Sequence, residues 1–272
     1  MDTIESKLKT TLVRKGRRAA LFLSVVVLIA ACDAARAAAA ADVSLWRLDC
    51  GQIRVDDLND FSDTFAYPGR SMRLVVSCYL IRHGDTYMLW DTGLPESALG
   101  QSLDGKDAKE ETLSVTVVDQ LRRIGVDPAR VSIGGISHYH YDHTGQAARS
   151  ARAKPLTHWL DGGGKLQEVV GDRDVFEDAS VIMLDLPGHT PGHHGLLVKL
   201  PHTGAVILSG DAAHFRENYD SDGLPAWNTD RAQTVASLHR IKQIVKNLGA
   251  ILVIQHDPDD VKRLPAFPEP AR

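Results

Sequence analysis

Three histidines and an aspartate fall within six residues of the segment SHYHYDHTGQ, which runs from Ser137 to Gln146. Imidazole nitrogens and carboxylate oxygens are ligands that suit zinc and other borderline first-row cations. His138 and His140, two positions apart, can point to one side of an extended segment. Asp142 and His143 follow once the backbone has turned, so they can address a second position nearby. The segment therefore predicts a metal site, and the chain must fold so that further ligands reach it.

Other polar residues follow the ends of apolar, strand-like runs. Asp91 follows TYMLW, Asp211 follows AVILSG and His256 follows ILVIQ. Loops that leave the same edge of a sheet converge in layered α/β folds, so we expect these side chains to meet the histidine segment. With His189 the candidate ligands become too many for one tetrahedral zinc, and they suit two metals roughly 3.5–4 Å apart. The full set is His138, His140, Asp142, His143, His189, Asp211 and His256.

Short β-branched runs alternate with longer helical patterns from Val43 onward, without a linker or repeat. His83-Gly84-Asp85 is typical of a hairpin turn between two strands, and Asp230 and Gly249 suit the two ends of a helix. Antiparallel strands followed by helix–strand alternation predict sheets covered by helices in one domain, residues 42–272. The predicted helices are Thr112–Ile124 and Ala232–Leu248. The predicted strands are Val43–Leu48, Leu74–Arg82, Tyr87–Trp90, Ser132–Ile136, Ser180–Leu184, Gly195–Lys199, Ala205–Ser209 and Ile251–Ile254.

Residues 1–41 have the pattern of an export signal followed by an alanine-rich segment. Basic residues precede an apolar run at 19–31, which is short for a mature transmembrane helix and has the length of a signal-peptide core. Ile29-Ala30-Ala31-Cys32 resembles a bacterial lipoprotein box, which would leave a lipidated Cys32. Cleavage near Ala41 would instead release a soluble product, and an uncleaved anchor is a third alternative. We expect an exported protein, either periplasmic, lipid-anchored in the bacterial envelope or secreted, with no other membrane contact.

Composition narrows the class of partner and of metal ligand. The net charge of −4, with scattered lysines and arginines, gives no basic stripe for nucleic acid. We therefore expect a small-molecule substrate. Of the three cysteines, only Cys50 and Cys78 lie beyond the export segment, and either a disulfide or two buried thiols is consistent with their contexts. Two cysteines cannot build a zinc site, so the ligands must be histidine and carboxylate.

The order of these motifs resembles the metallo-β-lactamase superfamily. H-x-H-x-D-H, PGHTPGHH, LSGD and a late histidine after an apolar strand together span Asp91 to His256. The resemblance implies a four-layer αββα sandwich, with two mixed sheets flanked by helices, and two divalent ions per chain, zinc with iron or cobalt as alternatives. His189 is preferred over His193 and His194 because it follows Pro187-Gly188. The implied first-metal ligands are His138, His140 and His189; those of the second are Asp142, His143 and His256; Asp211 bridges, and Asp91 supports the ligands from behind.

Within the superfamily, the chain resembles the N-acyl-homoserine lactonases. The likeness extends beyond metal ligands into DTGLPES and ENYD. It implies hydrolytic opening of a lactone ring by a hydroxide that bridges the metals, with Asp142 as a proton carrier to the leaving alkoxide or as a ligand only. The alternatives are a hydrolase of the same fold acting on another ester, a thioester, a phosphodiester or a β-lactam, and a non-catalytic metal-binding envelope protein.

One position departs from the lactonase pattern. The lactonases carry a tyrosine three residues after the bridging aspartate, where it contacts the substrate carbonyl, and this chain has His214. An imidazole can also donate a hydrogen bond, so His214 is predicted to be a catalytic contact. The alternative is a structural role for His214, with Tyr219 or a metal contacting the carbonyl.

An aromatic loop is the candidate contact for an acyl chain. Phe61, Phe65 and Tyr67 lie in NDFSDTFAYPG, a segment that ends with the Pro68-Gly69 pair typical of a loop. The alternative is that these rings anchor the loop onto the domain. Met72 and Trp227 are further candidates of the same kind.

Overall fold

The structure is a computed structural model that describes residues 42–106, 108–147 and 164–272. The described residues form one compact unit. The predicted export segment, residues 1–41, lies outside the described residues. Among the helices of the described part, none has the length and apolar character needed to span a membrane.

The first sheet has five strands in the described part of the chain and carries the N-terminal half. Its strands pair antiparallel except for β3 and β5, which run parallel. A two-residue turn at Gly84-Asp85 joins β2 and β3, with Gly84 at a φ of 55°, so the predicted hairpin is confirmed. In spatial order the strands are β4 (Glu111–Thr112), β1 (Val43–Val55), β2 (Met72–His83), β3 (Thr86–Trp90) and β5 (Val131–Gly135).

The second sheet also has five strands within the described residues and carries the C-terminal half. Only β9 and β10 pair in parallel; the other neighbours are antiparallel. In spatial order the strands are β10 (Ile251–Val253), β9 (Gly204–Leu208), β8 (His194–Leu200), β7 (Val181–Asp185) and β6 (Arg173–Asp174).

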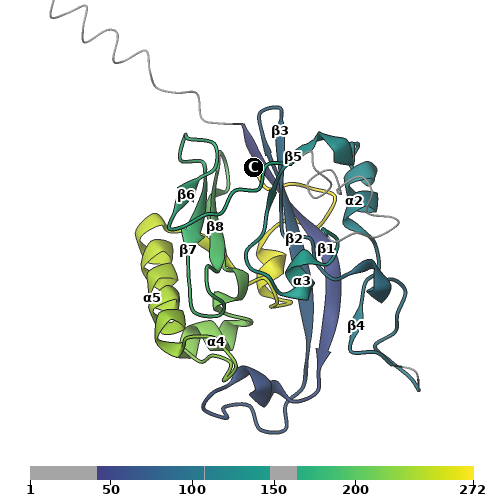
Figure 1. Cartoon of the computed structure of the whole chain (residues 1–272), viewed down its shortest axis with the longest axis vertical. Coiled ribbons are helices and arrows are strands. Elements are labelled where there is room, and N and C mark those ends of the chain that lie inside the picture. The colour runs from purple at the N-terminus through teal and green to yellow at the C-terminus, as the bar shows by residue number, and fades with distance from the viewer. Residues whose placement is uncertain (1–41, 107, 148–163) are drawn as a thin grey trace, which may run out of the picture. The chain divides into compact units, whose positions relative to one another are not determined.

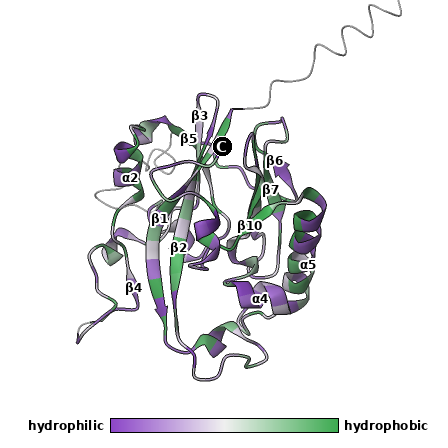
Figure 2. Cartoon of the chain, turned by 180° about the vertical axis from the view of Figure 1, so that it is seen from behind, coloured by the Kyte–Doolittle hydropathy of each residue, from purple (hydrophilic) through white to green (hydrophobic). Residues whose placement is uncertain are grey.

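The two sheets pack face to face, and each has a helix on its outer face. Tyr79 and Trp90 of the first sheet are fully buried against Leu196 and Val206 of the second. Helix α2 (Val117–Arg123) covers the first sheet through a separate apolar cluster, and α5 (Arg231–Leu248) covers the second. Figure 1 shows these two helices on opposite sides of the paired sheets, and Figure 2 shows hydrophobic and hydrophilic residues alternating along α5. The predicted αββα sandwich is confirmed.

Two helix predictions had different outcomes. Helix α5 begins after Asp230, whose carboxylate accepts from the Gln233 amide, and ends at Gly249 with a φ of 59°, as expected. The helix predicted from Thr112 is too long, because it begins only at Val117, after the cap residue Thr116. Thr112 belongs to β4 and pairs with β1. The short elements β4, β6 and α4 (Arg216–Ser221) are not among the elements predicted from the sequence.

A disulfide joins Cys50 of β1 to Cys78 of β2, with their Cα atoms 5.8 Å apart and both residues fully buried. This settles the alternative that the sequence left open. A β-bulge lies at this point in β1, between Asp49 and Gln52. Pairing with β2 resumes at Gln52 and continues to Val55, so β1 runs past its predicted end. The loop after β3 rests on the disulfide, because the Leu94 amide donates to the Cys50 carbonyl at 3.1 Å. A side chain at Gly93, which has a φ of 71°, would collide with Cys50. The disulfide therefore supports the loop that carries Asp91.

Candidate metal centre

Five segments bring acidic and histidine side chains to one place. Asp91 follows β3, the histidine segment lies between β5 and helix α3 (Tyr141–Thr144), and His189 lies between β7 and β8. Asp211 is in the short helix η5 (Gly210–Ala212) after β9, and His256 follows β10. The residues that follow the strand ends therefore converge in the structure, as expected from the sequence.

The side chains form two groups, each with its candidate ligand atoms within 4.8 Å of one another. Asp211 belongs to both. Its Oδ2 atom lies 3.6 Å from His138 Nε2 and 3.5 Å from His189 Nε2. Its Oδ1 atom lies 3.2 Å from His143 Nε2 and 3.1 Å from His256 Nε2. The carboxylate thus presents one oxygen to each group. The groups are His138, His140, His189 and Asp211, and Asp142, His143, Asp211 and His256, the same partition that the family resemblance implies.

The second group directs lone pairs at a common point. His143 Nδ1 donates to Asp91 Oδ2 at 2.9 Å, and His256 Nδ1 donates to the Val75 carbonyl at 2.8 Å. Both acceptors lack a proton to give, so each ring donates from Nδ1, and once Nε2 is deprotonated its lone pair is free for a metal. The two Nε2 atoms are 3.3 Å apart. With both rings neutral, two lone pairs at this separation would repel each other, whereas a cation beside them is attracted to both, so the donor set fits a bound metal ion.

The side chains of the first group also direct their ligand atoms toward one point. Asp91 Oδ2 accepts from the Ser137 hydroxyl at 2.9 Å, so the Ser137 oxygen is free to accept from His138 Nδ1, 3.1 Å away. His138 Nε2 then faces His189 Nε2 at 3.2 Å, and His140 Nδ1 lies 3.1 Å from the same His189 atom. Three imidazole nitrogens and one carboxylate oxygen therefore surround a single point, as four-coordinate zinc requires.

Asp91 organises both groups without belonging to either. Its Oδ1 accepts from the Ser137 amide at 2.7 Å and its Oδ2 accepts from Gln255 Nε2 at 2.8 Å. The residue is fully buried and adopts a φ of 58°, a left-handed conformation that aspartate tolerates better than most residues. The geometry is that of the carboxylate expected to support the ligands from behind.

Protonation differs between the two groups. Burial lowers the pKa of His138 well below its usual range and lowers the pKa of His189 to about 2, so both rings are neutral at neutral pH. Burial also lowers the pKa of His143, but the nearby carboxylates, Asp211 foremost, outweigh it and hold that pKa well above its usual range. The pKa of His256 is raised in the same way. Metal binding to the second group must therefore displace protons.

The pKa of Asp211 is held well below its usual range. Burial opposes this shift, and the surrounding imidazoles, His143 first and then His256, outweigh it. His193 fixes the backbone of the same residue: its Nδ1 donates to the Leu186 carbonyl at 2.9 Å, so its Nε2 accepts from the Asp211 amide at 2.8 Å. His193 is therefore a support for Asp211, and its Nε2 is not available as a ligand.

His214 lies inside the site with both ring nitrogens unpaired among the described residues. It is almost fully buried, and its Nε2 lies 3.4 Å from Asp211 Oδ2. Its ring stacks parallel to His256, with centroids 5.9 Å apart, and meets Phe61 edge-on at 4.8 Å. A buried donor without a hydrogen-bond partner destabilises the folded protein. The ring nitrogens of His214 are therefore available to hydrogen-bond a molecule that enters the site.

The aromatic candidates divide by position. Phe61 faces the site and packs against Trp227, with ring centroids 5.7 Å apart. Trp227 is half exposed, lies 5.3 Å from the His189 ring, and donates from Nε1 to the Asp60 carbonyl. Phe65 is exposed on the loop, and Tyr67 is buried beside Phe215. Within the part of the chain that the structure describes, Phe61 is the one loop aromatic whose ring contacts a side chain of the site, that of His214.

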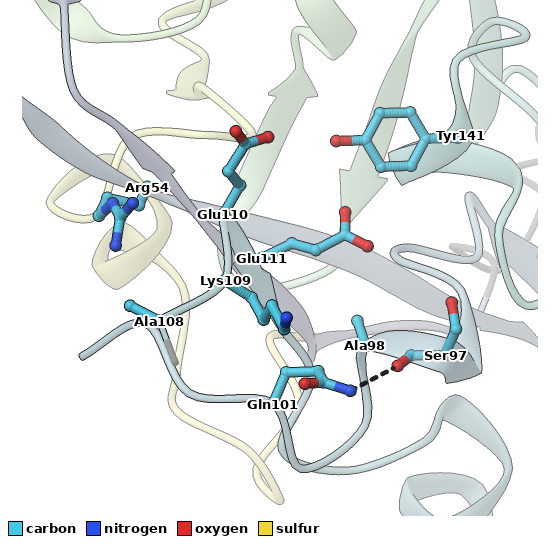
Figure 3. Close-up of a pocket in the computed structure, with 9 residues that line it drawn as sticks. All are labelled: Arg54, Ser97, Ala98, Gln101, Ala108, Lys109, Glu110, Glu111 and Tyr141. Carbon is cyan, nitrogen blue, oxygen red and sulfur yellow. Dashed lines mark hydrogen bonds between the residues drawn. The ribbon is translucent and has the colours of Figure 1, made fainter. Parts of the chain in front are cut away.

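A cavity of about 710 Å³ lies beside Tyr141, the residue before Asp142 (Figure 3). Figure 3 shows the carboxylates of Glu110 and Glu111 turned toward the Tyr141 hydroxyl. Arg54 and Lys109 also line it. The lining is mostly polar and charged, so this cavity suits a polar group better than a bare hydrocarbon chain.

Several supporting residues are not among those predicted from the sequence. Gln255, Ser137 and Asn228 contact a candidate ligand or its supporting carboxylate, yet none is itself a predicted ligand. Val75 acts through its backbone carbonyl. Ser137 and Gln255 are direct neighbours of His138 and His256 in the sequence, and that adjacency is the signal that could have found them.

The comparisons with known proteins agree with this geometry. The family described as the metallo-beta-lactamase superfamily matches residues 72–256, so the chain belongs to that superfamily. The N-acyl homoserine lactonase of Bacillus thuringiensis is 28% identical over 225 residues, which cover 74% of this chain and 89% of the relative. The lactonase AttM of Rhizobium radiobacter is 31% identical over 179 residues, covering 55% of this chain and 68% of AttM.

Solved structures show the same fold. A quorum-quenching N-acyl homoserine lactone hydrolase superposes with a TM-score of 0.66 at 27% identity, covering 84% of this chain and 97% of that one. A second structure, of an N-acyl homoserine lactone hydrolase with N-hexanoyl-L-homoserine bound at its catalytic metal center, gives a TM-score of 0.65 at 27% identity and covers 84% and 98% of the two chains.

We predict that removal of the shared carboxylate disrupts both metal positions. Elemental analysis of the metal-replete wild-type protein should find two divalent ions per chain, and the Asp211→Ala variant should retain fewer than one, because each group loses an oxygen ligand. The control is His239→Ala, which removes an exposed histidine paired with Asp222, and it should keep two ions. Two tightly held ions in a folded Asp211→Ala variant would contradict the bridging role.

Proposed function

We propose that the protein is a two-metal hydrolase that opens the lactone ring of N-acyl-homoserine lactones. The observation that carries the proposal is the pair of ligand groups sharing Asp211, with the unpaired His214 beside them. The similarity to lactonases in sequence and fold supports the choice of substrate. The chain departs from the lactonase pattern at His214, which stands where the lactonases carry a tyrosine.

The ligand groups fit two divalent cations, with zinc as the proposed ion and iron or cobalt as alternatives. When bound, such a pair supplies an activated water at neutral pH and positive charge for the oxygen of the scissile carbonyl. The residues of this chain would position the two ions. The anionic Asp211 fixes the spacing of the two positions. Asp91 orients the ring of His143 directly and the ring of His138 through the Ser137 hydroxyl.

Asp142 is the proposed proton carrier. Its Oδ2 lies 3.6 Å from His143 Nε2 and 3.5 Å from His256 Nε2, so it reaches the second group with one oxygen. Its side chain is 11% exposed, more than that of Asp211 at 4%. The second oxygen can therefore face the reacting atoms, accept a proton from the attacking water and pass it to the leaving alkoxide.

His214 is the proposed contact to the lactone carbonyl. Its ring nitrogens make no hydrogen bond among the described residues, although Nε2 lies 3.4 Å from Asp211 Oδ2, and the ring sits between the ligand groups and Phe61. A donor held here stabilises negative charge on the carbonyl oxygen as the ring opens, because it is oriented before the substrate arrives. The tyrosine of the lactonase pattern would supply the same hydrogen bond.

The acyl chain is proposed to lie against Phe61 and Trp227, which present adjoining aromatic surfaces beside the first group. Phe65, on the same loop and exposed, is a second contact for a longer chain, and Tyr67 holds the loop to the domain through Phe215. The polar cavity beside Tyr141 suits a polar part of the substrate. The partner is a small molecule, with no role proposed for nucleic acid.

We propose that the protein acts outside the cytoplasm, after export. The support is the sequence of residues 1–41, with its basic start, apolar run and the candidate lipid attachment at Cys32. A disulfide between Cys50 and Cys78 is consistent with an oxidising compartment.

The substrate class is tested by following proton release from a panel of compounds with metal-replete protein. We expect acyl-homoserine lactones to be opened faster than γ-lactones without an amide, and faster than thioesters, phosphodiesters or a chromogenic β-lactam. Faster turnover of one of the other classes, with no opening of the lactones, would replace the proposed substrate and leave the two-metal hydrolase intact. No turnover of any compound by protein holding two ions would contradict the enzyme assignment.

The role of His214 predicts a specific loss of rate. The His214→Ala variant should lower kcat/KM for the lactone by about 100-fold, the usual effect of removing one donor to a developing oxyanion. His214→Tyr, which restores a donor, should recover most of that rate, and both variants should keep two metal ions. A kcat/KM within about a factor of two of the wild-type value in His214→Ala would show that the ring does not contact the reacting carbonyl.

A further inference from the structure

The ring of His189 is held by a side chain from a distant segment. His189 Nδ1 lies 3.0 Å from Asn228 Oδ1, across 39 residues of sequence. The rings of His143, His138 and His256 are supported through Asp91, Ser137 and a backbone carbonyl, all on or next to the first sheet or the ligand motifs. His189 is thus the ligand whose support is a neutral amide in the loop before α5.

A chain of hydrogen bonds sets which end of that amide faces His189. The Thr234 hydroxyl lies 2.7 Å from the Asp230 carbonyl, and a carbonyl can only accept, so the hydroxyl donates to it. The Thr234 oxygen then accepts from Asn228 Nδ2 at 3.2 Å. With its NH₂ group committed to Thr234, Asn228 turns Oδ1 toward His189. An amide oxygen only accepts, so His189 carries its hydrogen on Nδ1 and its lone pair on Nε2, where the first group needs it.

The backbone around this chain leaves little room for movement. The Asp230 amide donates to the Gly188 carbonyl at 2.8 Å, and the Thr229 amide donates to the His189 carbonyl at 3.1 Å. Gly188 has a φ of 130°, and a Cβ there would lie 2.2 Å from the Thr234 nitrogen. The loop that carries His189 and the first turn of α5 therefore fit each other closely, and Asn228 is fixed relative to the ring that it contacts.

We propose that Asn228 is a positioning residue of the metal centre, which selects the tautomer of His189 and thereby strengthens metal binding to the first group. It acts through His189 and contacts neither metal nor substrate. The second group should not depend on it, because the Nδ1 atoms of His143 and His256 are held by Asp91 and the Val75 carbonyl. The inference rests on the two-metal part of the proposed function and is independent of the lactone substrate.

Zinc titration of the metal-free protein tests the proposal. Competition with a chelator, followed by calorimetry, resolves the affinities of the two positions. In Asn228→Leu, which keeps the size of the side chain and removes the acceptor, we expect the affinity of one position to fall about 10- to 100-fold, the usual effect of losing such a partner. The other position should keep its affinity. Asn228→Asp, which keeps an acceptor oxygen, should retain both affinities.

The matched control is Gln233→Leu, which removes an exposed amide that bonds Asp230 in the same helical turn. Both of its affinities should equal those of the wild-type protein. Unchanged affinities in Asn228→Leu would overturn the proposal, and so would an equal loss at both positions that Asn228→Asp does not rescue. Failure of the wild-type protein to bind two zinc ions would instead contradict the metal centre itself.

The ring nitrogens of His189 provide a readout that is measured on the wild-type protein. Nitrogen NMR of metal-free wild-type protein, with His189→Gln used only to assign the signal, should show His189 with its hydrogen on Nδ1. A ring with its hydrogen on Nε2 would overturn the proposal, because Asn228 would then not select the tautomer that binds metal.

Discussion

The shared carboxylate of Asp211 is the interaction on which the rest of the site depends. It is buried among imidazoles, and each of its oxygens faces a different ligand group. A buried charge without partners is strongly destabilising, so this aspartate requires the histidines and cations around it. The surrounding fold is shaped to hold it: His193 accepts from its amide, and Gly210 has a φ of 53° where a Cβ would lie 2.5 Å from the His193 ring. The carboxylate is therefore held in place relative to the second sheet, with one oxygen toward each candidate ligand group.

The histidine rings are oriented from outside the ligand groups, by both halves of the sandwich. Asp91, which follows β3, and the Val75 carbonyl of β2 set the tautomers of His143 and His256. Asn228 does the same for His189 from the loop before α5. Because these supports belong to different layers, the lone pairs converge only when the two sheets are packed together. The buried core between the sheets and the disulfide behind the Asp91 loop thus contribute to function as well as to stability.

Much of the site could be predicted from the sequence, because ligand motifs are local. His138 to His143 lie in one short segment, and Asp211 and His256 each follow an apolar strand, so their types and positions indicated a two-metal centre before any fold was known. The αββα architecture was implied by the resemblance of these motifs to the metallo-β-lactamase superfamily, whereas the strand and helix pattern alone predicted sheets covered by helices. Supports such as Asn228 could not be found in this way, because they depend on contacts between segments far apart in the chain. The early start predicted for α2 has a similar cause: pairing of Thr112 with β1 overrides local helical pattern.

Crystals of the metal-replete protein, measured on both sides of the absorption edge of the bound metal, test the central claim most directly. The account predicts two anomalous peaks roughly 3.5–4 Å apart. One should lie among His138, His140 and His189, the other among Asp142, His143 and His256, with one oxygen of Asp211 on each. A single peak, or two peaks of which only one is bound by Asp211, would contradict it.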